Sequence, residues 1–297
     1  MIKPPILQKG DKIAITCPAK ALVGPMTDAI KLLESWGLIV VLGETINATF
    51  HQFSGTDELR AKDMQTFIND QDIKAIIAAR GGYGCIRIVD EIDWTPLLQQ
   101  PKWIIGFSDI TIFHLQLQSM GLQSLHAQMP STIKESSKEG LDSLRKVLFG
   151  EDLNYEIKPS PLNRIGKAKG ELIGGNLSLL IANLESTSDV DYTEKILFIE
   201  DVGEYLYAID RMIRTLDRAG KLSHLKGLIV GGFTSIKDND IPFGFNPQEI
   251  INAIVSKYNY PICYDFPAGH IEDNRALVLG RMIDFEVTEK LMKLSFS

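Results

Sequence analysis

The sequence predicts an α/β protein of two lobes. In the first 120 residues, short apolar runs rich in β-branched side chains alternate with amphipathic helical patterns. This alternation is typical of right-handed βαβ units that build a mostly parallel sheet. A second region of the same kind follows residue 160, and the chain of 297 residues exceeds the roughly 100–200 residues of one domain. Two α/β domains are therefore expected.

The elements of the first lobe follow from these periods. Strands are expected at 12–16, 38–42, 73–78 and 103–107, and helices at 25–36, 56–69, 86–91 and 109–120. Gly121 stands where a helix commonly ends in the left-handed conformation.

Residues 149–169 contain glycine and proline among charged side chains and are interpreted as a linker or a segment that crosses between the lobes. The expected domains are therefore 1–160 and 161–297. In the second lobe we expect strands at 196–199, 227–230, 262–266 and 277–279, with helices at 205–219 and 247–257.

Composition excludes several classes of protein. The formal charge is −7 and no stripe of lysine and arginine is present, so no nucleic-acid partner is expected. No apolar run approaches the ~20 residues of a membrane span, and the first 20 residues lack a signal-peptide pattern, so a cytoplasmic location is expected. The three cysteines form no CxxC pair, which predicts reduced, buried thiols. Neither HExxH nor HxH occurs, so no metal and no cofactor are expected.

Ser108 is the first candidate for chemistry. The segment Gly106-Phe107-Ser108-Asp109 follows an apolar strand and precedes a helical pattern. It resembles a nucleophile elbow, a sharp turn that exposes a serine hydroxyl near backbone amides, although Ile110 replaces the second glycine of G-x-S-x-G. The alternative is a serine that only caps the helix.

The glycine-rich loop Arg80-Gly81-Gly82-Tyr83-Gly84 also ends a predicted strand. Glycines at this edge allow backbone amides to approach a ligand or an oxyanion closely. The loop fits neither G-x-G-x-x-G nor the Walker pattern, so a nucleotide site is only weakly indicated, and a plain glycine turn is the alternative.

Two further candidates follow strands of the second lobe. Glu200 stands after the apolar run 196–199, where an acid can orient a histidine, although a solvated loop acid would look the same. His270 follows Gly269 on a loop after strand 262–266 and has the pKa of a general base. The competing histidines are His51, His114, His126 and His224.

These residues, in this order and spacing, resemble the serine LD-carboxypeptidases, a family that includes murein tetrapeptide carboxypeptidases and microcin C immunity peptidases. The resemblance spans nearly the whole chain. It rests on Gly10-Asp11-Lys12-Ile13 with Pro18, Arg80 to Gly84, Gly106 to Asp109, His126, Gly174-Gly175-Asn176-Leu177, Glu200 to Glu204, Asp210-Arg211-Met212, Gly269-His270 and Gly280.

The resemblance implies a Ser–His–Glu triad in which Ser108 attacks the carbonyl, His270 is general base and then acid, and Glu200 orients the imidazole, with Glu204 as the fallback. The backbone amides of Asp109 and Gly82 would form the oxyanion hole. It also implies an N-terminal lobe like a class I glutamine amidotransferase domain, a smaller C-terminal α/β lobe that carries the acid and the histidine, and a homodimer.

The implied substrate is a cytoplasmic murein tetrapeptide, cut before its terminal D-alanine during peptidoglycan recycling. Arg80 is a candidate partner for the terminal carboxylate and Tyr83 a second substrate-binding residue. Residues 271–275 depart from the small residues that the family often carries there. Two alternatives stay open: a microcin C-type amidase acting on aminoacyl-nucleotides, and a nucleotide-binding α/β module without hydrolytic activity.

Overall fold

The structure is a computed structural model that describes residues 1–296. It divides into two compact units. The N-terminal unit contains Met1–Asp152 together with Glu272–Leu279, and the C-terminal unit contains Leu153–Ile271 and the chain from Gly280 onward. The sequence predicted a boundary near residue 160, whereas the chain changes unit after Asp152 and returns to the first unit for eight residues, Glu272–Leu279.

The N-terminal unit is built on a six-stranded sheet in the order β11-β5-β4-β3-β1-β2. All strands are parallel except β11, which pairs antiparallel with β5. This confirms the predicted α/β class with a parallel first sheet. The strands are β1 Lys12–Thr16, β2 Ile39–Leu42, β3 Ile73–Ala78, β4 Trp103–Gly106, β5 Ser124–His126 and β11 Leu277–Leu279.

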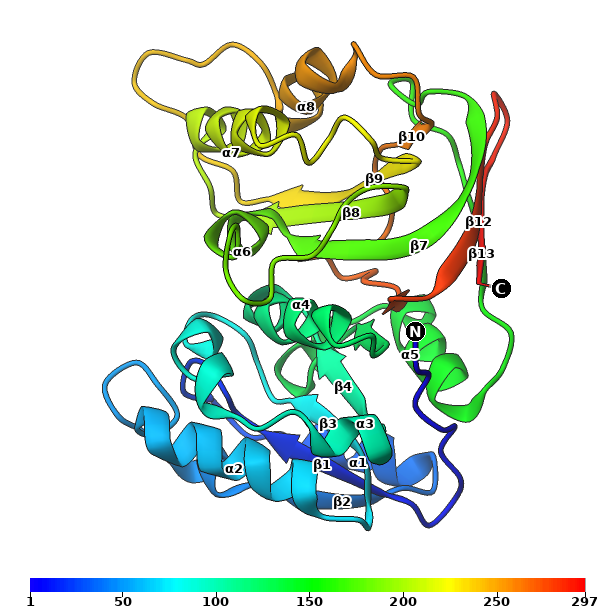
Figure 1. The fold of residues 1–297 in the computed structure, drawn as a ribbon. Helices are drawn as coiled ribbons and strands as arrows, with labels where there is room; N and C mark the ends of the chain where they lie inside the picture. Colours follow the sequence, from blue (N-terminus) through cyan, green and yellow to red (C-terminus); the bar gives the residue numbers. More distant parts are fainter. Residues whose placement is uncertain (297) are drawn as a thin grey trace. The chain divides into compact units, whose positions relative to one another are not determined.

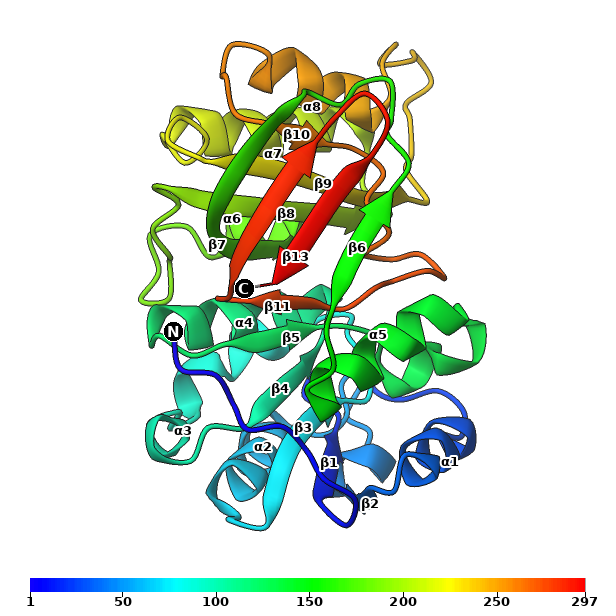
Figure 2. The ribbon, with the colours of Figure 1, turned by 90° about the vertical axis from the view of Figure 1, so that its right-hand side faces the viewer.

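Helices cover both faces of this sheet. In Figure 2, α2, α3 and α4 lie on one side of the strands, and α1 and α5 lie on the other. Side-chain caps begin two of them: Thr56 accepts from the Leu59 amide at α2, and Ser137 accepts from the Gly140 amide at α5. The helices are α1 Thr27–Ser35, α2 Asp57–Asn69, α3 Pro96–Gln99, α4 Thr111–Ser119 and α5 Lys138–Phe149.

The C-terminal unit contains a seven-stranded sheet in the order β10-β9-β8-β7-β12-β13-β6. Strands β7 to β10 are parallel, and β12, β13 and β6 extend the sheet antiparallel. Figure 1 shows α6, α7 and α8 beside β8 and β9. The elements are β6 Asn154–Ile157, β7 Gly166–Asn176, α6 Leu177–Ala182, β8 Lys195–Val202, α7 Leu206–Arg218, β9 Gly227–Thr234, α8 Pro247–Val255, β10 Ile262–Cys263, β12 Met282–Val287 and β13 Met292–Phe296.

The chain does cross from one unit to the other within residues 149–169, after Asp152, but much of this segment is not a loop, because β6 and the start of β7 lie there. Along this part of β7 the exposed lysines Lys167 and Lys169 alternate with less exposed small residues and form ion pairs with Glu286 and Asp284 across the strand pair. A strand with one charged, solvated face lacks the apolar run used to recognise strands elsewhere. Within residues 1–296 no helix combines the length and apolarity that crossing a membrane would require.

Candidate active site

Ser108 lies in a strained turn directly after β4. Its φ of 63° is in the left-handed region, which non-glycine residues seldom occupy. The residue begins a short 3-10 turn, whose capping position is held by Phe107 without a side-chain capping hydrogen bond. Ser108 is therefore not placed as a helix cap. Its side chain is partly exposed, and a strained serine between a strand and a helix is the geometry of a nucleophile elbow.

The glycine loop after β3 comes against this turn. A Cβ atom on Gly81 would stand 2.8 Å from Cβ and 2.9 Å from Oγ of Ser108, and 3.3 Å from the Asp109 amide nitrogen. Only glycine allows such an approach. Gly82 follows, exposed and at a φ of 118°, another conformation that favours glycine. The loop thus places backbone beside the serine.

The Asp109 side chain joins the two segments from behind. It is buried, and its Oδ2 accepts a hydrogen bond from the Cys85 amide at 2.8 Å. Burial raises the pKa of Asp109, although the hydrogen bond from Cys85 works in the opposite direction. The backbone of Asp109 is therefore held at Ser108 while its carboxylate holds the end of the glycine loop.

Glu200 is buried in the C-terminal unit, with 0% of the residue exposed. Strand β8 was expected to end at residue 199, but it continues to Val202, and Glu200 stands where the pairing with β9 shifts register. The extra residue of that bulge is on β9, at Gly231 and Gly232. The Gly232 amide there donates to the Ala268 carbonyl at 2.9 Å. The bulge therefore holds the loop that contains Ala268 and His270 close to Glu200.

His270 and Glu200 form a short pair. The Nδ1 atom of His270 lies 2.6 Å from Oε2 of Glu200, and the His270 amide donates to the same oxygen at 3.2 Å. A Cβ atom on Gly269 would stand 2.7 Å from Cβ of Glu200, so glycine permits this approach. Of the two acids considered for orienting the histidine, Glu200 and Glu204, the carboxylate of Glu200 makes this bond.

The charge of Glu200 controls the imidazole. Burial lowers the pKa of His270, but the Glu200 charge and hydrogen bond outweigh it, and the net pKa is raised above 6.5. The neighbouring Asp201 is also affected: burial, and then the Glu200 charge, raise its pKa to about 7. Nδ1 carries the hydrogen toward Glu200, which leaves Nε2 as the atom for proton exchange with a substrate.

Sequence reasoning did not find the partners of Asp201. Its carboxylate accepts from Nδ2 of Asn176 at 2.9 Å and from the Ser178 amide at 3.0 Å. These bonds connect β8, next to Glu200, to the end of β7 and to the first turn of α6. The sequence signal that could have pointed to this network is Asn176, which directly follows Gly174 and Gly175 at the end of a strand. Its partner is 25 residues away along the chain, which local patterns do not reveal.

The predicted substrate-binding residues lie on the glycine loop. Arg80 is partly buried, and its Nη1 donates to the Ala21 carbonyl at 2.9 Å. The Tyr83 side chain is 46% exposed, and its ring centroid lies 6.0 Å from that of Phe53. Ser108, Asp109 and the loop belong to one compact unit, and Glu200 and His270 to the other.

The competing histidines have other surroundings. His114 is buried in α4 and donates from Nε2 to the Gly106 carbonyl at 2.9 Å, and burial lowers its pKa to about 4. His126 is buried within β5, whereas His51 and His224 are exposed. The expected core or surface positions of His114 and His224 are confirmed.

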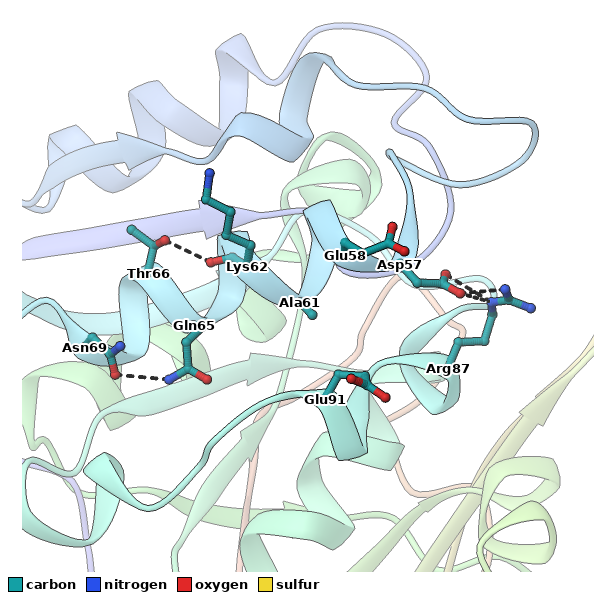
Figure 3. Close-up of a pocket in the computed structure, with 9 residues that line it drawn as sticks. All are labelled: Asp57, Glu58, Ala61, Lys62, Gln65, Thr66, Asn69, Arg87 and Glu91. Carbon is teal, nitrogen blue, oxygen red and sulfur yellow. Dashed lines mark hydrogen bonds and ion pairs between the residues drawn. The ribbon is translucent and has the colours of Figure 1, made fainter.

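Beyond the histidines, the chain also contains three cysteines and a pocket beside α2. The thiols of Cys17, Cys85 and Cys263 are free and buried, as expected. In residues 1–296 no cluster of three or more His, Cys, Asp or Glu side chains could hold a metal ion. A pocket of about 640 Å³ runs along α2 and contains none of the predicted catalytic residues (Figure 3). It is lined by Asp57, Glu58, Ala61, Lys62, Gln65, Thr66, Asn69, Arg87 and Glu91.

Known proteins resemble the chain over nearly its full length. Residues 13–127 match the LD-carboxypeptidase N-terminal domain and residues 169–285 the LD-carboxypeptidase C-terminal domain. A probable murein peptide carboxypeptidase of Bacillus subtilis is 33% identical over 97% of this chain and 92% of its own. The murein tetrapeptide carboxypeptidase of Pseudomonas aeruginosa is 28% identical, covering 91% of each chain.

Solved structures agree. Muramoyltetrapeptide carboxypeptidase from Oxalobacter formigenes has a TM-score of 0.88 and 26% identity, covering 96% of this chain and 98% of its own. The microcin C7 self-immunity protein MccF, bound to aspartyl sulfamoyl adenosine, has a TM-score of 0.89 at 20% identity, covering 99% and 98%, and shares the fold. Two domain matches in the predicted order, and a relative at 33% identity over 97% of this chain, establish that the chain belongs to the LD-carboxypeptidase family of serine peptidases.

Proposed function

We propose that the protein is a serine LD-carboxypeptidase that releases the terminal D-alanine from murein tetrapeptides. The observation that carries the proposal is Ser108, held at a φ of 63° with Gly81 against its side chain. Backbone strain of this kind persists only where the surrounding structure imposes it, and it clusters at active sites. Family membership and the names of the relatives support the same reaction class.

In the first step, the proposed nucleophile Ser108 Oγ forms a bond to the scissile carbonyl carbon while its proton passes to Nε2 of His270. The negative charge that develops on the carbonyl oxygen would be stabilised by the amides of Asp109 and Gly82, which the turn and the glycine loop present as backbone donors. Removal of one such donor in other enzymes costs about 10²–10³ in kcat. The contribution expected here is of that size.

In the second step, Nε2 of His270 returns the proton to the amine of D-alanine as the C–N bond breaks. Water, deprotonated by the same nitrogen, then hydrolyses the acyl-enzyme and regenerates Ser108. Glu200 stabilises the imidazolium that forms in both steps. The 2.6 Å contact and the raised pKa of His270 support this role for Glu200.

A carboxypeptidase must also recognise the terminal carboxylate of its substrate. We assign this to Arg80, whose guanidinium is positioned through the Ala21 carbonyl on the loop that carries Gly82. The exposed ring of Tyr83 is the proposed second contact. A role in cytoplasmic wall recycling and assembly as a homodimer complete the proposal and rest on the family resemblance.

The experiment measures D-alanine released from a synthetic tetrapeptide by the wild type, Ser108→Ala and His270→Ala. We expect release by the wild type and a loss of at least about 10³-fold in each variant. Unchanged circular dichroism and unfolding midpoints would show that both variants fold. Wild-type protein that releases no D-alanine from tetrapeptides containing either meso-diaminopimelate or L-lysine would refute the proposal.

A second substrate separates the two hydrolase hypotheses. Aminoacyl sulfamoyl adenosine, offered to the same three proteins, should remain intact if the protein is a tetrapeptidase. Cleavage of this nucleotide in place of the peptide, again lost in Ser108→Ala, would instead assign the microcin-type amidase activity.

A further inference from the structure

We propose that Arg60 is a positioning residue for the oxyanion hole, acting through the glycine loop. The inference rests on the proposed function and concerns only the N-terminal unit. Arg60 is on α2 and is 0% exposed, which is unusual for a charged side chain. Replacing a buried charge and its partner by apolar groups is often neutral or stabilising, so stability alone gives little reason to retain the buried guanidinium here.

The guanidinium of Arg60 joins three segments at the carboxyl edge of the sheet. Its Nη1 donates to the carbonyl of Pro18, which follows β1, and to the carbonyl of Gly84, which follows β3, the latter at 3.1 Å. Its Nη2 donates to Asp57 at the start of α2. The planar, forked guanidinium suits such divergent acceptors, whereas a lysine would present a single charged centre.

This contact holds one end of the glycine loop. A Cβ atom on Gly84 would stand 2.6 Å from Nη1 of Arg60, so the loop backbone rests directly on the guanidinium. The next residue, Cys85, donates its amide to Asp109. At the other end, Gly81 lies against Ser108. Gly82, the proposed oxyanion donor, therefore lies between two contacts of the loop: that of Gly81 with Ser108 and that of Gly84 with Arg60.

The aromatic ring of Phe53 reinforces the attachment. The Arg60 guanidinium lies 4.9 Å from the centroid of this ring and that of Arg87 lies 5.3 Å from it, while Tyr83 of the loop packs 6.0 Å away. Both arginines also bind Asp57. Arg87 is the outer of the two, at the end of the pocket in Figure 3, with 45% of its side chain exposed.

Arg87 therefore provides a matched control. It shares Asp57 and Phe53 with Arg60, but the side-chain bonds to the Pro18 and Gly84 carbonyls come from Arg60. Arg87 reaches the Gly84 carbonyl through its backbone amide, at 3.1 Å, and Arg87→Met keeps that bond. If Arg60 acts by positioning the loop, Arg60→Met should impair catalysis and Arg87→Met should not. If the contacts of Arg60 with Asp57, Phe53 and the two carbonyls only stabilise the fold, the two variants should differ in free energy of unfolding and have the same kcat.

The test compares D-alanine release by the wild type, Arg60→Met, Arg60→Lys and Arg87→Met. A donor displaced by about 1 Å costs roughly 10²-fold, so we expect kcat to fall about 10- to 100-fold in Arg60→Met, with KM changed by less than about threefold. Arg60→Lys should recover part of this loss. Arg87→Met should stay within about threefold of the wild type.

Hydrogen exchange gives a second readout that is independent of activity. Amides of residues 81–85 should exchange faster in both Arg60 variants, while those of α5 keep wild-type rates. Equal kcat in folded Arg60→Met and Arg87→Met, or unchanged exchange of residues 81–85, would overturn the inference. If Arg60→Met fails to fold, Arg60→Lys decides by the same two criteria. An inactive wild type would instead refute the proposed function while the exchange result still stands.

Discussion

The pKa of His270, which the neighbouring Glu200 raises, determines the pH range in which the proposed base can work. The imidazole must be neutral to accept a proton from Ser108, and its pKa is raised above 6.5 by the buried carboxylate. Activity should therefore rise along an acid limb whose midpoint lies above pH 6.5. The limb reports the strength of one residue pair.

Glu200→Gln removes the charge and keeps the shape. We expect the acid limb of kcat/KM to move to lower pH, because the neutral amide no longer favours the imidazolium, and the maximum to fall by at least about 100-fold. The measurement is a pH profile of D-alanine release by both proteins. Glu204→Gln is the control and should keep the wild-type midpoint. An unchanged limb in Glu200→Gln would contradict the assignment.

At this scale the sequence revealed residues that follow strands, because Ser108, Glu200 and His270 each come soon after an apolar run. It did not reveal Arg60 or Asp201. A charged side chain looks solvated in sequence unless its partners are known. Apart from Asp57, which precedes Arg60 on α2, the partners named for these two lie on other elements of the sheet edge. Burial of charge is a tertiary property, so local patterns do not predict it.

Among the elements, β4 and α4 are joined by the strained serine, and α4 contains a buried histidine. His114 on α4 donates to the last carbonyl of β4, that of Gly106. Burial holds its pKa at about 4, below the 6.5 of an unperturbed histidine. As pH falls below 6.5, the unfolded chain therefore binds the additional proton before the folded protein does. The free energy of unfolding consequently decreases progressively down to about pH 4.

His114→Gln should flatten this dependence. The amide can donate to Gly106 but cannot titrate, so the wild type should lose up to about 3 kcal/mol more than the variant between pH 7 and pH 4. Denaturant unfolding at both pH values measures the difference. The control is His224→Gln, which makes the same substitution at an exposed histidine. Parallel slopes for His114→Gln and the wild type would show that His114 is already charged in the folded protein.

The sequence largely predicted which segments form strands and helices, but it did not predict which sheet each strand joins. The strand at 277–279 was found from its apolar residues and expected in the second lobe, yet it joins the first sheet beside β5. Its partner, the strand around Leu125, is about 150 residues earlier. Periodicity indicates which face of a strand is buried but contains no information on which distant strand covers its edge.

For the whole molecule, the return of residues 272–279 to the first unit makes the stability of the N-terminal unit depend on a segment late in the chain. Leu277 is fully buried there, and all three tryptophans, Trp36, Trp94 and Trp103, also belong to this unit. Tryptophan fluorescence consequently reports its unfolding. A substitution near the C-terminus should be visible to probes in the first half of the sequence.

Leu277→Ala should lower the midpoint of the fluorescence transition, because truncating a buried leucine costs about 2–5 kcal/mol. The matched control is Leu294→Ala, equally buried but on β13 of the C-terminal unit. Its effect should be larger on circular dichroism than on fluorescence. If Leu277→Ala leaves the fluorescence midpoint unchanged, β11 contributes nothing to the first unit.

The late position of β11 also has a consequence for synthesis of the chain on the ribosome. Strand β5 is complete at residue 126, but the strand that covers its edge is complete only at residue 279. At about 5–20 residues per second, the ribosome needs roughly 8–30 s to make the intervening segment. During that interval the nascent N-terminal unit presents an unpaired β-edge, which is a template for wrong pairing. A chaperone that shields this edge would act on the half-made chain and have no target on the finished protein.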